Sequence, residues 1–316
     1  MMDIGTLTLN PTIDIACEVE QVIPMRKMRT QNERYDPGGG GINVARVFVR
    51  LGGNARCYYL SGGATGIAFD GLLDLHQLVR SPIRIAGATR VSTAVHERNT
   101  GQEFRFVPGG PDVTEEEWNE CLSRLEGSHH DFLVASGSLP RGVPSDFYAR
   151  VAAIAAKNDV RFVLDTSGEA LAAGIEGGGV HLAKPSLGEF RALIGHDLPD
   201  DTAIAEAATE LVRTKKIDYL AITMAERGAL LASREGVLRL PAITVETKSA
   251  VGAGDSFLAA MVHALASGKT PDMAFRFGLA AGAAAVLTPG TDLCRVKDVE
   301  RLFERSLAGG LEAELL

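Results

Sequence analysis

Short apolar runs alternate along the chain with longer runs whose apolar residues recur every three or four positions. The short runs predict β-strands, and the longer periodic runs predict amphipathic α-helices. Strands are expected at residues 4–9, 55–60, 132–135, 161–165, 180–184 and 219–223, and helices at 42–51, 69–79, 144–157, 187–194, 201–214, 256–266, 271–287 and 296–307. Because this alternation is typical of βαβ units, we expect an α/β fold whose mostly parallel sheet is covered by helices on both faces.

Two segments interrupt the alternation. Residues 12–35 lack a helical period, and residues 91–107 alternate around a turn at Asn99-Thr100-Gly101, which predicts a hairpin. We interpret both as strands of a small accessory sheet, inserted at about 12–36 and 88–107 into one domain that spans residues 1–316. Because such a sheet cannot bury both faces within a monomer, we expect it to cover a cleft or to pair with another subunit. A hairpin without a function is the alternative.

The segment that carries the strongest chemical signal is VGAGDSF at residues 251–257. A β-type run at 239–245 precedes it, and the helix expected at 256–266 follows it. A helix start offers unpaired N–H groups and the positive end of the helix dipole, so it suits an anion. Asp255 would then lie beside a bound phosphate, although an acid that only caps the helix could occupy the same position.

Composition narrows the possible functions. The 316 residues are 46% hydrophobic, and 32 Lys and Arg against 40 Asp and Glu give a net charge of −8. This balance argues against general nucleic-acid or membrane-surface binding. The scattered cysteines (Cys17, Cys57, Cys121 and Cys294) show no metal-binding spacing and are expected to be reduced thiols. Neither a signal peptide nor a membrane-spanning stretch is recognisable, so a cytoplasmic protein is expected.

Familiar nucleotide-binding motifs are absent. Ser267-Gly268-Lys269-Thr270 ends like a Walker A loop, but His263 stands where its first glycine is required. The glycines at 38–41 do not complete a dinucleotide fingerprint, because Asn43 and Val44 occupy the region of its last glycine.

Other residues suggest phosphoryl transfer to a hydroxyl. The loop from Gly38 to Asn43 allows close backbone approach to a ligand, and Asp14 follows the first strand. A second group, Lys184-Pro185-Ser186 with Glu189, lies between a strand and a helix, where phosphate or metal can bind. Basic residues in or beside the accessory strands could bind a phosphorylated substrate, although each alone is more often a solvated charge; they are Lys27, Arg90 and Arg105.

These motifs together resemble the PfkB (ribokinase-like) carbohydrate kinases. The resemblance covers nearly the whole chain and rests on TLTLNPTID (6–14), DPGGGGINVARVFVRLGG (36–53), SGGATG (61–66), TGQEFRFVPG (100–109), ASGSLPRGVP (135–144), DTSGEAL (165–171), KPSLGEF (184–190), VGAGDSF (251–257) and FGLAAGAAAV (277–286). It is strongest to the ATP-dependent 6-phosphofructokinase branch, because Gly40 stands where tagatose-6-phosphate and fructose-1-phosphate kinases typically have lysine. It implies a three-layer α/β/α fold with the accessory sheet as a lid.

The resemblance also implies roles for individual residues. Asp255 would accept the proton of the sugar 1-hydroxyl. The other implied roles are an anion hole (Gly252, Ala253 and Gly254), sugar binding (Asp14, Gly39, Asn43 and Ser138), 6-phosphate binding (Lys27, Arg90 and Arg105), ATP binding (Lys184, Ser186, Thr223, Gly228 and Ser249) and Mg²⁺ binding through water (Glu189). K⁺ could bind backbone groups near Ser249, Val251 and Gly290. The lid would also form a homodimer interface.

Three residues depart from the family pattern. Ser186 replaces a usual asparagine, Ala225 replaces a glycine, and Ala250 replaces a common threonine. The leading hypothesis is an Mg·ATP-dependent fructose-6-phosphate 1-kinase. The alternatives are a tagatose-6-phosphate or fructose-1-phosphate kinase and, from another class, a sugar-phosphate-binding regulator with poor turnover.

Overall fold

The computed structural model describes residues 2–290, 292–310 and 314–315. Among these, ten strands form the main sheet: β1 (Asp3–Thr8), β4 (Asn54–Ser61), β5 (Val79–Arg84), β8 (Phe132–Ser136), β9 (Arg161–Asp165), β10 (Val180–Ala183), β11 (Tyr219–Thr223), β12 (Ala229–Ser233), β13 (Gly236–Leu240) and β14 (Glu314–Leu315). Their order is β14-β13-β12-β11-β10-β9-β8-β1-β4-β5. Pairing is parallel from β5 to β11 and antiparallel from β11 to β14. The predicted mostly parallel sheet is confirmed.

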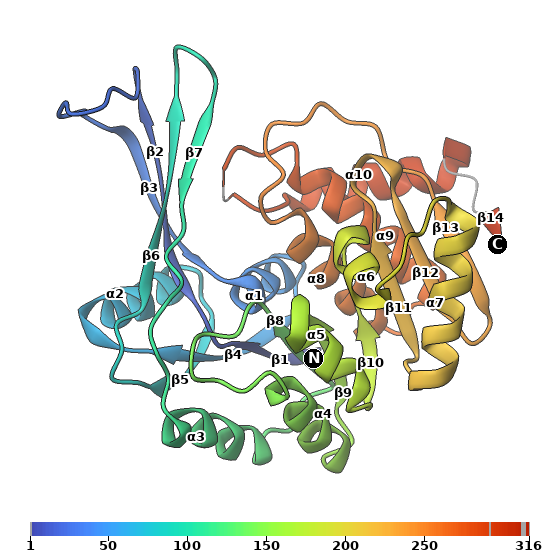
Figure 1. Cartoon of the computed structure of the whole chain (residues 1–316). Coiled ribbons are helices and arrows are strands. Elements are labelled where there is room, and N and C mark those ends of the chain that lie inside the picture. The colour runs from blue at the N-terminus through green and yellow to red at the C-terminus, as the bar shows by residue number, and fades with distance from the viewer. Residues whose placement is uncertain (1, 291, 311–313, 316) are drawn as a thin grey trace.

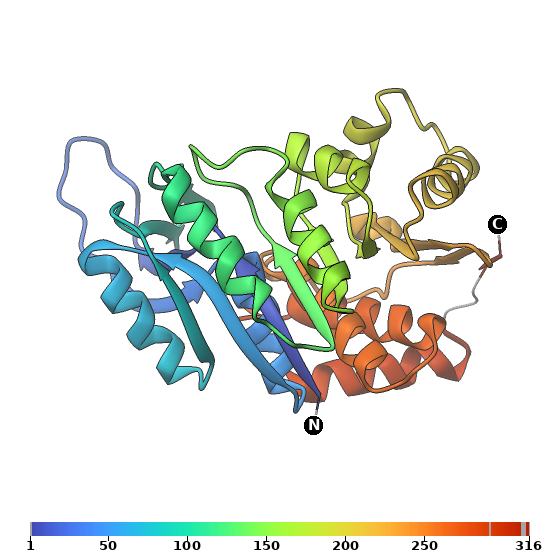
Figure 2. The ribbon, with the colours of Figure 1, turned by 90° about the horizontal axis from the view of Figure 1, so that it is seen from below.

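Helices cover both faces of this sheet (Figures 1 and 2). One buried cluster includes residues of α1 (Gly40–Arg50), α2 (Gly63–Leu75), α8 (Ala253–Ala266), α9 (Pro271–Ala285) and α10 (Val296–Arg305). A second includes residues of α3 (Glu115–Glu126), α4 (Phe147–Lys157), α5 (Gly168–Glu176), α6 (Leu187–Ile194) and α7 (Asp201–Lys215). Within β8, Phe132 and Val134 belong to the first cluster and Leu133 and Ala135 to the second, because side chains alternate across a strand. The fold is a three-layer α/β/α sandwich.

A second, four-stranded sheet projects away from this body (Figure 1). It consists of β2 (Thr12–Val19), β3 (Gln31–Gly38), β6 (Arg90–Glu97) and β7 (Glu103–Phe106), in the order β3-β2-β6-β7. β2 pairs parallel with β6, and the other pairs are antiparallel. This confirms that residues 12–35 and 91–107 form a small accessory sheet.

Several predicted boundaries were wrong. The run at 239–245 is not one strand: β13 ends at Leu240, because Pro241 has no N–H to continue the ladder. α8 begins at Ala253, three residues earlier than expected, and α2 begins at Gly63, six residues before the predicted start at residue 69. The prediction missed β5, α3, α5, β12 and β14. Among the described residues, no helix is long and apolar enough to cross a membrane.

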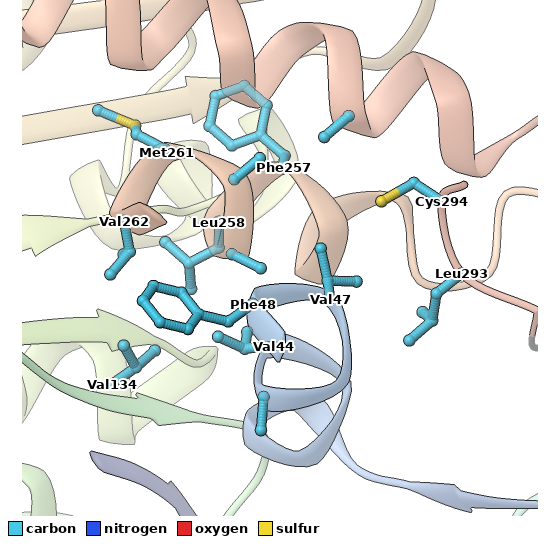
Figure 3. Close-up of a cluster of buried hydrophobic side chains, with 14 of the residues drawn as sticks. Val44, Val47, Phe48, Val134, Phe257, Leu258, Met261, Val262, Leu293 and Cys294 are labelled. Atoms are coloured by element: carbon cyan, nitrogen blue, oxygen red, sulfur yellow. The ribbon is translucent and has the colours of Figure 1, made fainter. Parts of the chain in front are cut away.

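The packing of α1 against α8 fixes the position of the site (Figure 3). Val44, Val47 and Phe48 of α1 lie against Leu258 and Val262 of α8, and all five are fully buried. Fully burying an aliphatic or aromatic side chain contributes about 1.5–3 kcal/mol. This interface therefore holds the N-terminal turns of two helices that are far apart in the sequence rigidly beside each other.

Candidate active site

Two predicted site residues, Lys184 and Thr223, and one that was not predicted, Asp165, lie at the ends of successive strands at one edge of the main sheet. Asp165 ends β9, Lys184 comes directly after β10, and Thr223 ends β11. These strands are parallel, so their carboxyl ends meet at the same edge. The strand order reverses around β1, which lies between β8 and β4. Open α/β sheets bind ligands at such a switch point, and Asp14 follows β1 there.

The N-terminus of α8 opens onto this edge. Gly252 is the N-cap residue with φ of +72°, a left-handed conformation that glycine adopts without steric cost. The N–H groups of the first helical turn lack acceptors within the helix. Among the predicted anion-hole residues, Ala253 donates its N–H to the Ala250 carbonyl over a long 3.4 Å. Gly254 lies close to a cation, since a Cβ there would be 3.2 Å from Lys184 Nζ.

Asp255 lies in this first turn and contacts a residue from α1. Asn43 Nδ2 donates to Asp255 Oδ2 over 2.9 Å. Burial raises the pKa of Asp255 to about 6, and the Asp165 charge adds to the increase, whereas Asn43 and Lys184 oppose it. A carboxylate with this pKa is mostly ionised near neutral pH and can still accept a proton, as a general base must.

Asp14 is the second carboxylate of the site. It pairs with Asp36 across β2 and β3, and a Cβ on Gly38 would lie 1.9 Å from Asp14 Oδ2. Gly38 is therefore required for the carboxylate to occupy this place. Burial raises the pKa of Asp14 to about 6, against the Thr12 hydrogen bond and the charge of Arg90.

Lys184 forms a buried ion pair at the site. Its Nζ lies 3.0 Å from Asp165 Oδ1, and Ser136 Oγ donates to the other oxygen over 3.1 Å. Burial lowers the pKa of Lys184, but attraction to Asp165, then to Asp255 and Glu189, prevails and raises it above its usual value. A fixed cation therefore faces the α8 N-terminus.

Ser186 and Glu189 form a capping box at the start of α6. Glu189 Oε2 accepts from the Ser186 N–H over 2.7 Å, and Ser186 Oγ accepts from the Glu189 N–H over 3.3 Å. No group of three potential metal ligands occurs within residues 2–290, 292–310 and 314–315. Mg²⁺ in phosphoryl-transfer sites uses one or two carboxylates, with water and phosphate completing its shell. Glu189, a single carboxylate at the start of α6, thus fits a nucleotide-bound Mg²⁺ held through water rather than a protein cage.

The segment after β11 lies beside Ser186. Thr223 forms a β-bridge with Ser186 and donates its N–H to the Pro185 carbonyl over 3.1 Å. Ala225 has φ of +49°, a left-handed conformation that costs a residue with a Cβ about 1–2 kcal/mol. Alanine in place of the family's glycine is therefore locally strained. Gly228 is required, because a Cβ there would lie 2.2 Å from the Leu240 carbonyl oxygen. These predicted ATP residues are brought together with Lys184.

Ser249 lies apart from them, next to Gly290. Its Oγ donates to the Gly290 carbonyl over 3.4 Å and accepts from the Val251 N–H over 3.2 Å. The backbone groups predicted to bind K⁺ thus come from neighbouring loops.

Asn10 links Arg90 to Ser138 at the base of the accessory sheet. Arg90 donates to the carbonyls of Pro108 and Asn10 over 2.9 and 2.8 Å. Asn10 Nδ2 in turn donates to the Gly109 carbonyl over 3.0 Å and lies 3.5 Å from Ser138 Oγ. An open cavity of about 560 Å³ lies here, lined by residues 87–90 and 108–112 and by Arg141.

The other two predicted phosphate ligands lie farther along the same sheet. Arg105 is exposed on β7, where its register partner is Ala94. Lys27 is exposed in the loop after β2, at the opposite end of the sheet from Arg90. Val19 precedes that loop and pairs with Glu97, which places it roughly 23 Å along the strand from Arg90. Within a single chain, therefore, Lys27 and Arg90 lie far apart.

Sequence reasoning missed Arg46 and gave Asp165 no role. Arg46 is only 3% exposed and lies among Asp36, Pro37 and Asn43. Because Arg46 lies in a predicted amphipathic helix, nothing in the sequence indicated that its side chain would be buried. The position of Asp165 at a strand end could have indicated a site residue, since the neighbouring Lys184 was found by that argument.

Comparison with known proteins identifies the family. The profile of the pfkB family carbohydrate kinases matches residues 7–298. The chain belongs to the pfkB family of carbohydrate kinases. It is 42% identical over 303 residues to ATP-dependent 6-phosphofructokinase isozyme 2 of Mycobacterium tuberculosis, covering 95% of this chain and 88% of that protein. It is 36% identical over 304 residues to the Escherichia coli protein of the same name, covering 96% and 98%.

Solved structures agree with this assignment to the pfkB family. Escherichia coli phosphofructokinase-2 in complex with potassium superposes with a TM-score of 0.92 at 35% identity, covering 96% of this chain and 99% of that one. The same enzyme in complex with fructose-6-phosphate gives 0.90 at 34% identity with equal coverage. A further relative by sequence, a 1-phosphofructokinase of Borreliella burgdorferi, is 30% identical over 302 residues, covering 95% of this chain and 96% of that protein. The predicted family, fold and kinase class are therefore confirmed.

Proposed function

We propose that this pfkB-family kinase transfers the γ-phosphoryl group of ATP to the 1-hydroxyl of fructose-6-phosphate. The observation that carries the proposal is Asp255, held by Asn43 at the N-terminus of α8 with its pKa raised to about 6. The names of the Mycobacterium tuberculosis and Escherichia coli relatives support the choice of sugar. Position 40 also supports fructose-6-phosphate, because it is glycine and not the lysine typical of tagatose-6-phosphate and fructose-1-phosphate kinases.

The proposed reaction uses charge and proton positions that the chain supplies. The hydroxyl oxygen forms a bond to the γ-phosphorus as the bond to the β–γ bridging oxygen breaks, and ADP departs with that electron pair. Asp255 takes the hydroxyl proton. The first-turn N–H groups of Gly252, Ala253 and Gly254 stabilise charge that develops on the transferred group. Lys184, 3.0 Å from Asp165, offers a second positive charge to the phosphates.

The sugar would lie between the accessory sheet and α1. Asp14, Gly39, Asn43 and Ser138 would contact its hydroxyls, and Arg90 and Arg105 its 6-phosphate. Closure of the accessory sheet as a lid would exclude water, which competes as phosphoryl acceptor. Since Lys27 lies far from Arg90 in one chain, it would reach a 6-phosphate only from a second subunit.

A homodimer through the accessory sheet would provide that subunit. Large apolar side chains on and beside its strands are exposed, among them Tyr35 at 56% and Phe106 at 61%. Exposed apolar patches on soluble proteins mark interaction surfaces. The match to Escherichia coli phosphofructokinase-2, for which a tetrameric inhibited form is known, is compatible with self-association.

Two ions complete the proposal. Glu189, through water, would hold Mg²⁺, which when bound with ATP neutralises charge on its phosphates. The backbone carbonyls around Ser249, Val251 and Gly290 would hold K⁺, as the potassium complex of the Escherichia coli enzyme suggests. Ser186, Ala225 and Ala250 motivate the alternative of a sugar-phosphate-binding regulator with poor turnover.

Steady-state assays of ADP release test the proposal. We expect kcat/KM to be highest with fructose-6-phosphate, and lower with tagatose-6-phosphate and fructose-1-phosphate. A higher kcat/KM with tagatose-6-phosphate or fructose-1-phosphate would show that the substrate is a different sugar phosphate and that the phosphoryl transfer is as proposed. Sugar-phosphate binding by calorimetry without ADP release would instead favour the regulator.

Removing the predicted phosphate ligands should weaken substrate binding more than turnover. We expect Arg90→Ala and Lys27→Ala each to raise KM for fructose-6-phosphate about tenfold or more with a smaller change in kcat, because phosphate binding contributes to ground and transition states alike. The measurement is KM for fructose-6-phosphate and for unphosphorylated fructose. An unchanged ratio between the two sugars would locate the 6-phosphate elsewhere.

A further inference from the structure

Arg46 is a buried cation next to the proposed base that the mechanism above does not use. It lies on α1 one turn after Asn43 and is 3% exposed. Burial lowers the pKa of its guanidinium, and the Asp36 carboxylate opposes this. An arginine so fully removed from water requires hydrogen-bond partners to remain stable.

Its guanidinium joins three groups from two elements. Nη1 donates to Asn43 Oδ1 over 3.2 Å and to the Pro37 carbonyl over 3.1 Å, and Nη2 donates to Asp36 Oδ1 over 2.9 Å. Asp36 and Pro37 belong to β3 of the accessory sheet, whereas Asn43 belongs to α1. The planar fork of arginine holds two nitrogens in fixed directions toward these acceptors, whereas lysine has one ammonium nitrogen whose donors are not held in such a plane.

This contact selects one orientation of the Asn43 amide. A guanidinium can only donate, so the amide oxygen must face Arg46. The amide NH₂ group then faces Asp255, to which Nδ2 donates over 2.9 Å. The flipped amide would direct its nitrogen at a cation and its oxygen at a carboxylate, so both contacts would become repulsive.

We propose that Arg46 is a positioning residue for phosphoryl transfer: it locks the Asn43 amide toward Asp255 and ties it to Asp36 of the accessory sheet. The inference rests on the proposed role of Asp255 as base. It implies that the sheet which covers the sugar also sets the geometry of the base. Asp36 pairs in register with Asp14, a predicted sugar ligand. The chain of contacts from Asp36 through Arg46 and Asn43 therefore links a sugar-binding strand pair to the proposed base.

Other charges near these residues must be kept constant in a test. Asp255 faces Asp165, Lys184 and Asp14, and Arg46 faces Asp36, Arg50, Asp14 and Asp292. His76 Nε2 lies 3.7 Å from Asp36 Oδ1, and burial lowers the pKa of this histidine. Arg46→Lys leaves all of these charges in place and removes only the fork.

Arg46→Lys should lower kcat about 10- to 100-fold, because small misplacement of reacting groups has effects of this size. KM for fructose-6-phosphate should change less than about threefold. The acidic limb of the kcat–pH profile should move to higher pH, since loss of the Asn43 hydrogen bond raises the pKa of Asp255. In an Asn43→Ala background the same substitution should have no further effect on kcat, because its action passes through Asn43.

Arg50→Lys is the matched control. Arg50 lies one turn farther along α1 and donates to the Cys294 carbonyl over 3.2 Å. The Arg50→Lys variant should have a kcat within about twofold of that of the unchanged protein. An equal loss of kcat from Arg46→Lys with and without Asn43, or an unshifted acidic limb, would overturn the proposal.

Folding is followed by thermal denaturation. If Arg46→Lys does not fold, Asp36→Asn, which keeps the shape and the arginine, should still lower kcat several-fold and shift the acidic limb. Normal kinetics of that variant would overturn the proposal. Full activity of Asp255→Asn would instead refute the proposed base, which keeps the two failures distinct.

Discussion

Asp255→Asn is expected to lower kcat by roughly 10²–10⁴-fold, the usual contribution of a positioned general base. The amide preserves the shape of the side chain but cannot accept the hydroxyl proton. KM for fructose-6-phosphate and ATP should change little, because other residues are proposed to make those contacts. Steady-state ADP release at saturating substrates measures the effect.

The pH dependence and stability provide the controls. With the pKa of Asp255 near 6, kcat of the unchanged protein should fall as pH drops through about 6, and the residual activity of the variant should lose this limb. The folded-state pKa lies above the usual value of 3.8, so the contribution of Asp255 to stability falls as pH rises from about 4 to about 6 and stays low at higher pH. Asp255→Asn should therefore melt at an equal or higher temperature at pH 7.5. Near-normal kcat would contradict the role of Asp255.

Lys184→Met should lower both activity and stability. Loss of the cation beside the α8 N-terminus is expected to lower kcat/KM for ATP about 10²–10³-fold, the range found when a donor to developing charge is removed. Asp165 would be left buried without its 3.0 Å partner, and breaking such a pair costs about 3–5 kcal/mol. Kinetics with varied ATP and urea denaturation measure the two effects.

A double variant separates these effects. Lys184→Met with Asp165→Asn removes both charges, so most of the lost stability should return while ATP turnover stays low. If activity returned with stability, Lys184 would act only by supporting the fold. If kcat/KM for ATP were unchanged in the single variant, Lys184 would not contact the phosphates.

Local patterns were sufficient to predict the fold class and the centre of the site. Alternating apolar runs identified the parallel strands other than β5, and VGAGDSF combined a tight glycine turn with a helix start in one segment. The boundaries were less accurate where backbone chemistry outweighs hydrophobicity. At Pro241 the missing N–H ends β13 five residues before the apolar run at 239–245 does.

Relations between distant residues could not be read from the sequence. Arg46 looks like a solvated helix residue until the tertiary fold places β3 over it. Lys27 and Arg90 were grouped by charge, but strand register separates them within one chain. The departure at Ala225 is visible in the sequence, but its positive φ is visible only in the structure.

The contact between Asn43 and Asp255 spans 212 residues, which has a consequence for biosynthesis. A ribosome that adds about 5–20 residues per second needs roughly 10–40 s to make the intervening chain. During this interval Val44, Val47 and Phe48 have no α8 to cover them, so the nascent chain exposes an apolar stripe that chaperones could bind. The site can assemble only after α8 has been synthesised, and a prematurely terminated chain that lacks α8 also lacks the proposed base, Asp255.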